Sequence, residues 1–272
     1  MSPRKEVIGP HELWLGDCRE ILPALGTVDF VFTDPPYGHN NNNGDLIHRR
    51  EAALGHSPNG GSSPRPIAND GAAETAALIE WFFSALPTLL RPGSCCCCCG
   101  GGGGPDPQFA RWALQIDQHL DFKQMVVWDK GPMGMGWHYR RSYETVLVAQ
   151  RRGAACKWYD ETDAVENIIR PGYLGIRKII PQATDHPTPK PVELPRHFIR
   201  LHSKPGDVVL DPFMGGGSTA VAAHKEGRRF VGVEVDPVWF EHSCERLERA
   251  MQQPDLFIAS PPPQPKQEIL PL

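Results

Sequence analysis

Three groups of residues in this sequence could do chemistry, and each follows a short apolar segment. Asp34-Pro35-Pro36-Tyr37 combines a carboxylate, two rigid prolines and an aromatic ring. Residues 211–219 read DPFMGGGST, a glycine-rich turn behind a carboxylate, and Glu234 lies 23 positions (234 − 211) beyond its first residue. These types and spacings indicate a site for a nucleoside-like cofactor and a second, aromatic substrate.

The Asp34 turn has the groups needed to hold the amino group of an aromatic base. Such a nitrogen is a poor nucleophile, because its lone pair is delocalised into the ring. The Asp34 carboxylate and the Pro35 carbonyl could accept its two N–H groups and direct the lone pair outward. Pro35 and Pro36 would fix the angle of the turn, and Tyr37 offers a face for the base to stack on. A proline-rich turn with a surface tyrosine is the structural alternative.

The glycine-rich turn and Glu234 are typical of a fold that binds a nucleoside cofactor. Glycines let the backbone approach a ligand, and the helix that follows presents free N–H groups. Glu234 stands about where an acidic residue takes ribose hydroxyls. Asp211 would repel a pyrophosphate, so a cofactor with ribose, adenine and a zwitterionic end, such as S-adenosylmethionine, fits better. A merely tight turn is the alternative.

Alternating apolar segments place these turns at the ends of strands. We expect strands at 13–15, 28–33, 95–99, 122–128, 143–149, 207–210 and 229–233. We expect helices at 19–25, 72–90, 106–120, 191–202 and 239–251, and one that ends at 226. This alternation predicts an α/β fold with an open, doubly wound, mostly parallel sheet and helices on both faces.

The chain reads as a single catalytic domain, residues 1–253, followed by a flexible proline-rich tail, residues 254–272. Residues 39–71 are polar and rich in Gly, Asn, Ser and Pro, which predicts a long mobile loop. Residues 150–185 are irregular and contain basic and aromatic side chains.

Bulk composition is that of a soluble globular protein. The net charge is −4, so any surface that binds nucleic acid must be local. No apolar segment reaches the ~20 residues of a membrane span, and the N-terminus lacks a signal-peptide core. We therefore expect a cytoplasmic protein.

Five consecutive cysteines, residues 95–99, are unusual. Same-face sulfurs of a strand start ~6.6 Å apart, and no His or Cys pair lies nearby at finger-like spacing. Because cysteine behaves as a small buried apolar residue, a buried strand is the favoured interpretation over a metal site. We therefore expect no metal.

With these residues in place, the sequence resembles the S-adenosylmethionine-dependent amino-group DNA methyltransferases of bacteria and phages. The resemblance covers residues 13–249, and the catalytic motif precedes the cofactor loop, which is the permuted order of that family's beta group. The matching elements are Gly16-Asp17-Cys18, Asp34 to Tyr37, residues 186–191 (HPTPKP), residues 211–219 and Gly232-Val233-Glu234. The cysteine run and the short segment 151–185 depart from the family pattern.

The resemblance implies a Rossmann-like, seven-stranded sheet with an antiparallel edge strand, a homodimer, and target recognition by residues 150–185. It implies catalysis by Asp34, Pro35, Pro36 and Tyr37. It also implies cofactor contacts by Asp17, Cys18, Asp34, Thr188, Lys190, Asp211, Phe213, Gly215, Gly217, Ser218, Thr219 and Glu234.

The implied substrate is an adenine flipped out of double-stranded DNA, with or without a partner restriction endonuclease. Phosphate contacts are expected from Arg49 and Arg50 in the long loop, and from Arg140, Arg141, Arg151 and Arg152.

Three alternatives remain open from the sequence. The target could be cytosine in DNA, or RNA, because the pocket chemistry accepts either amino group; Asp before Pro-Pro-Tyr favours adenine in this family. A metal-binding or purely DNA-binding module built on the cysteines and arginines is the alternative from a different class.

Overall fold

The computed structural model of this protein describes residues 3–38, 68, 70–100, 108–131, 142–162, 164–174 and 190–253. Most of the predicted loop 39–71 and the whole predicted tail 254–272 lie outside the described residues. Within the described part of the chain, no helix is both long and apolar enough to cross a membrane.

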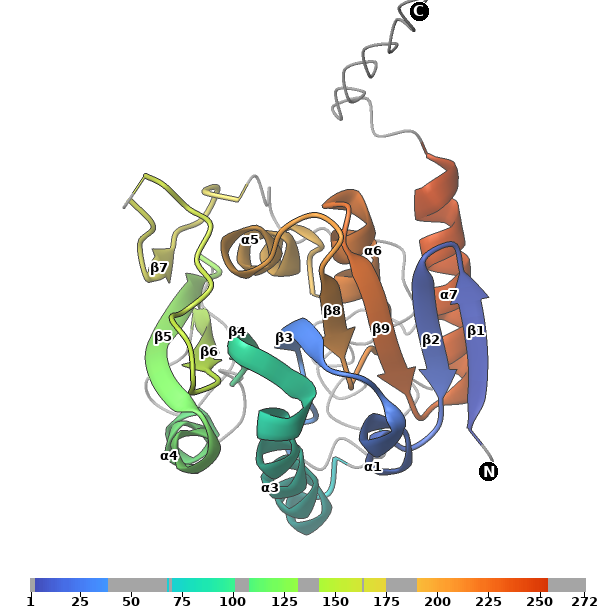
Figure 1. Ribbon diagram of the computed structural model, residues 1–272, viewed down its shortest axis with the longest axis horizontal. Coiled ribbons are helices and arrows are strands. Elements are labelled where there is room, and N and C mark those ends of the chain that lie inside the picture. The colour runs from blue at the N-terminus through green and yellow to red at the C-terminus, as the bar shows by residue number, and fades with distance from the viewer. Residues whose placement is uncertain are drawn as a thin grey trace, which may run out of the picture.

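The described strands form one nine-stranded sheet with the order β1-β2-β9-β8-β3-β4-β6-β5-β7 (Figure 1). Its strands are β1 (Arg4–Ile8), β2 (His11–Leu15), β3 (Val28–Thr33), β4 (Leu90–Cys99), β5 (Asp121–Asp129), β6 (Tyr143–Gln150), β7 (Ile168–Ile169), β8 (Val208–Asp211) and β9 (Arg229–Glu234). The five central strands from β2 to β4 run parallel to one another.

The mixed α/β prediction is confirmed, with two differences in detail. The sheet has nine strands and not seven, because the short strands β1 and β7 had no clear sequence signal and extend its two edges. β1 is an antiparallel edge strand, and β6 is also antiparallel but lies inside the sheet, between β4 and β5.

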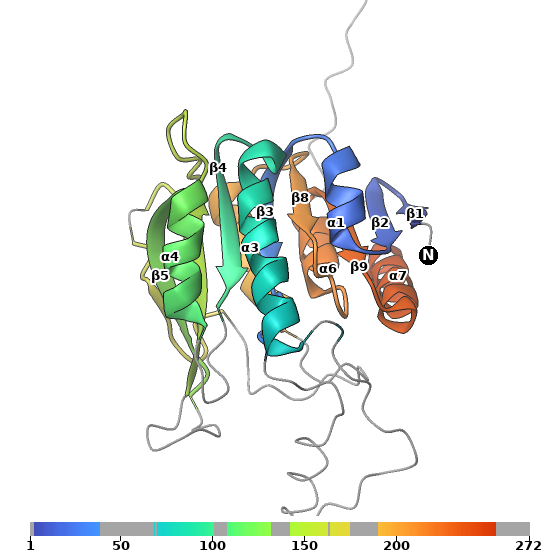
Figure 2. The same ribbon diagram turned by 90° about the horizontal axis from the view of Figure 1, so that it is seen from below.

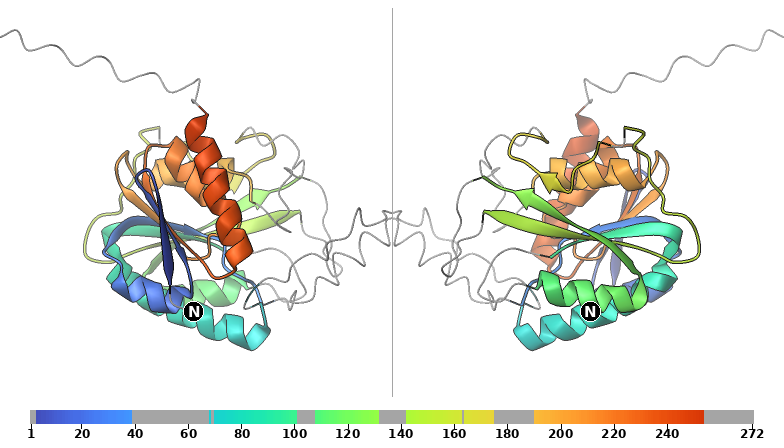
Figure 3. Two further views of the ribbon diagram at one scale, coloured as in Figure 1. Left: turned by 90° about the vertical axis from the view of Figure 1, so that its right-hand side faces the viewer. Right: turned by 90° about the vertical axis from the view of Figure 1, so that its left-hand side faces the viewer.

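Two layers of helices cover the sheet (Figure 3). Figure 2 looks at the face that α1, α3 and α4 cover. The described helices are α1 (Cys18–Ile21) with the 3₁₀ turn η1 (Leu22–Ala24), α3 (Ala72–Leu89), α4 (Phe109–His119), α5 (Glu193–His202), α6 (Ser218–Lys225) and α7 (Pro237–Gln252). Because both faces of the central strands are covered, β3 is buried along its whole length, and apolar residues occupy four of its six positions.

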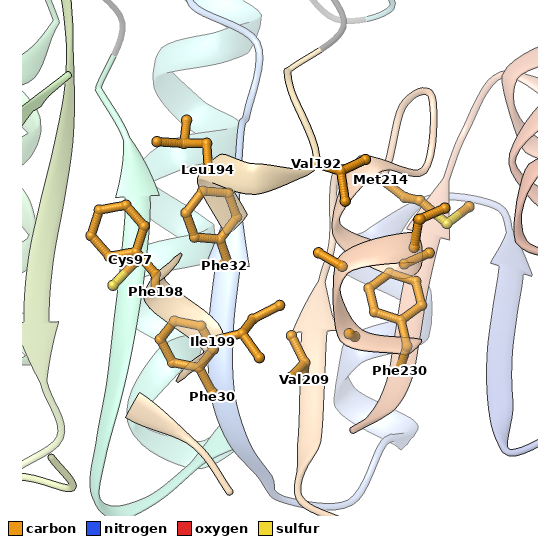
Figure 4. Close-up of a cluster of buried hydrophobic side chains, with 14 of the residues drawn as sticks. Phe30, Phe32, Cys97, Val192, Leu194, Phe198, Ile199, Val209, Met214 and Phe230 are labelled. Atoms are coloured by element: carbon orange, nitrogen blue, oxygen red, sulfur yellow. The ribbon is translucent and has the colours of Figure 1, made fainter. Parts of the chain in front are cut away.

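The five consecutive cysteines divide between the two cores, as alternation in a strand requires. Cys95, Cys97 and Cys99 belong to the cluster under α5, α6 and α7, where Phe30, Phe32 and Phe198 also pack (Figure 4). Cys96 and Cys98 belong to the cluster under α1, α3 and α4. All five are at most 1% exposed, so the prediction of a buried strand is confirmed.

Candidate active site at the carboxyl edge of the sheet

The carboxyl ends of β2, β3, β8 and β9 meet at one edge of the sheet, which we call the carboxyl edge. Parallel pairing sets this alignment: Val31 is opposite Leu210 in β8, Asp211 is opposite Gly232 in β9, and Leu15 of β2 is opposite Glu234. The turns that the sequence singled out follow these strands and therefore lie together. Open α/β sheets bind their ligands at such an edge.

Asp211 acts as a brace between two strands and a helix. It is buried, and its two carboxylate oxygens each accept a hydroxyl at 2.7 Å, one from Thr33 in β3 and one from Thr219 in α6. The Phe213 N–H donates to Asp211 as well, at 3.1 Å. Burial raises the pKa of Asp211 to about 6 despite these donors. The carboxylate is thus committed to intramolecular contacts, and we assign it to holding the glycine turn.

Glu234 is held in place by two backbone N–H donors. Its Oε2 accepts the Gly215 N–H and its Oε1 accepts the Asp236 N–H, both at 2.8 Å, which fixes the side chain against the glycine turn. Burial raises the pKa of Glu234 to about 7. A carboxylate has about four lone-pair sites, so each oxygen retains acceptor capacity for a hydroxyl.

The glycine turn wraps tightly before α6. Gly217 has a φ of 73°, and a Cβ atom there would come within 3.1 Å of the Ser243 side chain, so only glycine fits without strain. The Ser243 hydroxyl donates to the Gly215 carbonyl at 2.6 Å, and Arg246 donates to the Gly216 carbonyl at 2.6 Å. These contacts fix the turn against α7, and we call residues 215–217 the glycine cradle.

Asp17 and Cys18 lie at the start of α1, next to this cradle. Asp17 caps the helix by accepting the Arg19 N–H at 2.8 Å, and its bonds to the Arg19 guanidinium lower its pKa. The Gly16 N–H donates to the Glu234 carbonyl at 2.8 Å, which ties the turn to β9. Cys18 is 5% exposed, and burial raises its pKa to about 12, so it is a core residue here.

Asp34 follows β3 and takes part in a compact network of charged groups. Its carboxylate accepts the Tyr37 hydroxyl through Oδ1, and its Oδ2 lies 2.6 Å from the Lys190 ammonium. Lys190 also lies 3.3 Å from Glu144, whose other oxygen lies 2.7 Å from Lys130. We call Asp34, Tyr37, Lys190, Glu144 and Lys130 the carboxylate–lysine network.

Burial and charge oppose each other in this network. Burial would lower the pKa of Lys190, but the Asp34 and Glu144 carboxylates outweigh it and raise that pKa. Burial likewise works against the ionised form of Glu144, yet Lys190 and Lys130 lower its pKa to about 2. Lys190 and Glu144 therefore both stay ionised at neutral pH.

Tyr37 differs from the expected surface ring. It is half-buried, its ring lies 5.9 Å from the Trp112 ring at an angle of 31°, and the Lys190 ammonium lies 5.6 Å from its centroid. Gly38 directly after it donates its N–H to the buried Asp70 at 2.8 Å, which anchors the turn to the start of α3. The Tyr37 ring is therefore already fixed by Trp112 and by the anchored turn before any base stacks on it.

Glu144, Lys130 and Trp112 were missed by sequence reasoning. Glu144 had one weak signal, an acidic side chain near the start of an otherwise apolar strand. Lys190 was expected to contact the cofactor, and the structure pairs its ammonium with Asp34. Its backbone carbonyl accepts the Ser218 hydroxyl at 2.7 Å, so Lys190 links the Asp34 turn to the glycine cradle.

Of the predicted phosphate contacts, the two in the described part of the chain, Arg151 and Arg152, do not lie at this edge. Because β6 is antiparallel to β4, its last residue, Gln150, is opposite Cys95 near the other end of the sheet. Arg151 there donates to the Leu90 carbonyl, and Arg152 pairs with Asp121 and donates to the Leu120 carbonyl at 3.0 Å. The predicted site residues outside the described part of the chain are Arg49, Arg50, Arg140, Arg141 and Thr188.

The sequence of this chain is similar to those of known DNA methyltransferases. A family described as DNA methylase, of the N6 and N4 methyltransferases, matches residues 28–245. Type II methyltransferase M2.DpnII of Streptococcus pneumoniae is 31% identical over 118 residues, which span 41% of this chain and 44% of that relative. DNA adenine methyltransferase YhdJ of Escherichia coli is 25% identical over 260 residues, 84% of this chain and 79% of that protein.

Two solved structures share the fold. The M1.HpyAVI–SAM complex is 24% identical and has a TM-score of 0.58, covering 86% of this chain and 98% of that one. The PvuII DNA methyltransferase, described as cytosine-N4-specific, is 18% identical with a TM-score of 0.58, covering 87% of this chain and 86% of that one. These two likenesses speak for the fold alone.

Proposed function

Because this chain belongs to the N6/N4 DNA methylase family, we propose that it transfers a methyl group from S-adenosylmethionine to the exocyclic amino group of adenine in double-stranded DNA. The observation that carries the proposal is the position of Asp34. Its carboxylate lies at the same edge as Glu234 and the glycine cradle, and Lys190 bridges the two sites through its ammonium and its carbonyl.

Glu234 and the glycine cradle would hold the cofactor. The Glu234 carboxylate suits two ribose hydroxyls, and the three glycines at 215–217 would let a ligand approach the backbone without a Cβ in between. When bound, S-adenosylmethionine supplies a sulfonium methyl group, whose C–S electron pair leaves on sulfur as the new N–C bond forms.

Asp34 and the Pro35 carbonyl would hold the target nitrogen. Each Asp34 oxygen already carries one donor, the Tyr37 hydroxyl or the Lys190 ammonium, and retains acceptor capacity for the amino group of the base. A donor-filled carboxylate keeps its orientation before the base arrives, which is the preorganisation that stabilises a nitrogen as it becomes cationic. The base must first leave the duplex stack, at a cost of a few kcal/mol.

The target base and its site are tested by product analysis. Labelled cofactor is incubated with DNA and, in a parallel reaction, with RNA; each nucleic acid is digested to nucleosides, and the label is expected on N6-methyl-2′-deoxyadenosine. Label on N4-methyl-2′-deoxycytidine would overturn the adenine assignment, and label on RNA alone would overturn the DNA assignment. A methylation-sensitive sequencing map of DNA from expressing cells gives the recognition sequence.

The first described part of the proposed recognition segment, residues 150–185, packs away from Asp34. Lys157 donates its N–H to the Gly93 carbonyl and its ammonium lies 3.2 Å from Asp29, so the first part packs at the edge opposite Asp34. β7 then runs parallel to β5 toward the carboxyl edge. We propose that DNA contacts of this segment begin at β7.

We also propose that the protein forms a homodimer and that, in a restriction–modification pair, it has a partner endonuclease. Measuring the molar mass in solution tests the homodimer.

Cofactor affinity should depend on pH through Glu234. Burial raises its pKa to about 7, so the carboxyl is ionised above that pH and increasingly protonated below it. A protonated carboxyl loses acceptor capacity, so the Kd for S-adenosylmethionine should rise about tenfold from pH 8 to pH 6. Calorimetric titration at several pH values measures this.

Glu234→Gln is the matched control for that titration. It keeps the shape of the side chain but has no proton to release, so its weaker binding should be independent of pH over the same range. A wild-type Kd that is unchanged between pH 8 and pH 6 would contradict the assigned role of Glu234.

A further inference from the structure

Two thiols and an imidazole lie together at the edge of the sheet opposite Asp34. Cys95 is in β4, Cys156 is in the segment after β6, and His202 is the last residue of α5. The Cys95 and Cys156 sulfurs are 3.4 Å apart, and the potential ligand atoms of all three side chains lie within 4.8 Å of one another.

These distances suit a tetrahedral metal ion. Zinc binds thiolate sulfur at about 2.3 Å, which places two sulfurs of a tetrahedral site about 3.8 Å apart. The sulfurs here need to separate by only a few tenths of an ångström to reach that geometry. Two thiolates also balance the charge of a divalent ion, and sulfur with imidazole is a ligand set that zinc favours.

The histidine ring is already oriented by its surroundings. His202 is 3% exposed, and its ring stacks on Phe30 at 5.6 Å with an interplanar angle of 18°. The Trp158 and His202 ring centroids lie 5.3 Å apart at an interplanar angle of 72°, and the His202 Nδ1 lies 3.3 Å from the Lys157 carbonyl oxygen. Packing and a carbonyl partner of this kind orient metal-binding histidines.

The backbone that carries Cys156 is also fixed against β4. Gly93 donates its N–H to the Arg151 carbonyl at 3.0 Å and accepts the Lys157 N–H at 2.9 Å. Gly93 has a φ of 80°, and a Cβ atom there would come within 2.3 Å of the Ala155 carbonyl oxygen. Glycine at this position therefore allows the close approach that brings Cys156 to Cys95.

Access to the site comes from the Cys156 side. Cys95 and His202 are buried, whereas Cys156 is exposed, so an ion can arrive from solvent and keep one position for water. The other four cysteines of the run pack in the two apolar cores and offer no such opening. Within the described part of the chain, no other group of three metal-binding side chains has ligand atoms this close to one another.

We propose that Cys95, Cys156 and His202 bind one zinc ion, with water as the fourth ligand. The ion would join three segments far apart in the sequence: the start of the paired part of β4, residues 151–162 and the end of α5. It would thus act as a structural clamp at the edge opposite the Asp34 site. The expectation of no metal, drawn from the cysteine run alone, is revised by the two partners that folding supplies.

The test uses the full chain, reduced and stripped with a chelator, then titrated with zinc alone. Wild-type protein should bind about one equivalent, and cobalt in its place should show sulfur-to-metal charge-transfer absorption. Cys156→Ala should weaken zinc binding more than about a hundredfold, because even changes to groups behind the ligands cost roughly 10–100-fold. Cys156 is exposed, so this variant is expected to fold.

Cys244→Ala is the control for the loss of a thiol. Cys244 is a buried residue of α7 in the apolar core, and it is not one of the three proposed zinc ligands. It should bind zinc as the wild type does. Stoichiometric binding lost in Cys156→Ala and kept in Cys244→Ala supports the site. No bound zinc in the wild type, equal binding by Cys156→Ala, or a Cys95–Cys156 disulfide that persists in reductant would overturn it.

Discussion

Asp34→Asn is expected to reduce the rate of methyl transfer by about a hundredfold to a thousandfold, the usual effect of removing one preorganised polar partner. The substitution keeps the side chain's shape but places an NH2 group where a donor has to be accepted. It would face either the Lys190 ammonium or the amino group of the base. The single-turnover rate with saturating cofactor and DNA measures the effect on the chemical step.

Asp129→Asn is a suitable control for this experiment. Asp129 is a half-buried carboxylate at the end of β5, where its Oδ1 accepts the Gly131 N–H at 2.8 Å. It should leave the rate nearly unchanged. Cofactor affinity should persist in both variants. A normal rate in Asp34→Asn would refute the catalytic assignment, and a parallel loss of cofactor affinity would show that Asp34 acts in binding.

The position of the site was predictable because three of its strands end at or directly before an acidic residue that the sequence shows directly. Apolar segments that end in Asp34, Asp211 and Glu234 gave both the strands and their direction, and parallel strands bring such ends to one edge. The alternation of the cysteine run likewise predicted a buried strand. These inferences need only local sequence and the handedness of α/β connections.

Contacts that depend on the pairing of distant strands were not predictable in the same way. Glu144 reaches Lys190 only because β6 enters the sheet antiparallel beside β4. The same reversal carries Arg151 and Arg152 to the edge opposite Asp34, although the sequence suggested that they lie near the DNA. Nothing local distinguishes a parallel from an antiparallel partner for a short apolar strand.

Individual side-chain roles also depended on partners that the sequence does not reveal. Asp211 looked like a ligand-binding acid, yet both of its oxygens are taken by threonine hydroxyls from β3 and α6. The cysteine run had no partner nearby in the sequence at metal-binding spacing, and folding brings Cys156 to Cys95. In both cases the missing information was which buried polar group would satisfy which donor.

Lys190→Met is expected to destabilise the folded protein by about 3 kcal/mol, the lower end of the cost of breaking a buried ion pair. Methionine fills similar volume, but the Asp34 and Glu144 carboxylates lose the ammonium between them, and Glu144 keeps only Lys130 at 2.7 Å. Chemical denaturation at pH 7 measures the loss. The exposed Lys204→Met is the control and should change stability by less than about 0.5 kcal/mol.

The loss should depend on pH in a direction that the pKa shifts fix. The native pKa of Glu144 is about 2, below its ordinary 4.5, so its stabilising contribution is present above pH 4.5 and is lost as the pH falls toward 2. The native pKa of Lys190 is raised above 10.5, so its contribution is present below pH 10.5 and declines above it. The difference between wild type and Lys190→Met should therefore be constant between these limits and shrink on acidification below pH 4.5.

Adding Glu144→Gln to Lys190→Met isolates the interaction itself. Once the ammonium is gone, removing the Glu144 charge also removes an uncompensated buried group. The loss of unfolding free energy in the double variant should therefore be smaller than the sum of the two single losses by roughly 0.5–3 kcal/mol. Additive effects, together with a Lys190→Met variant as stable as Lys204→Met, would mean that the ion pairs around Lys190 contribute nothing to the fold. The Asp34 carboxylate would then need another group to orient it for the base.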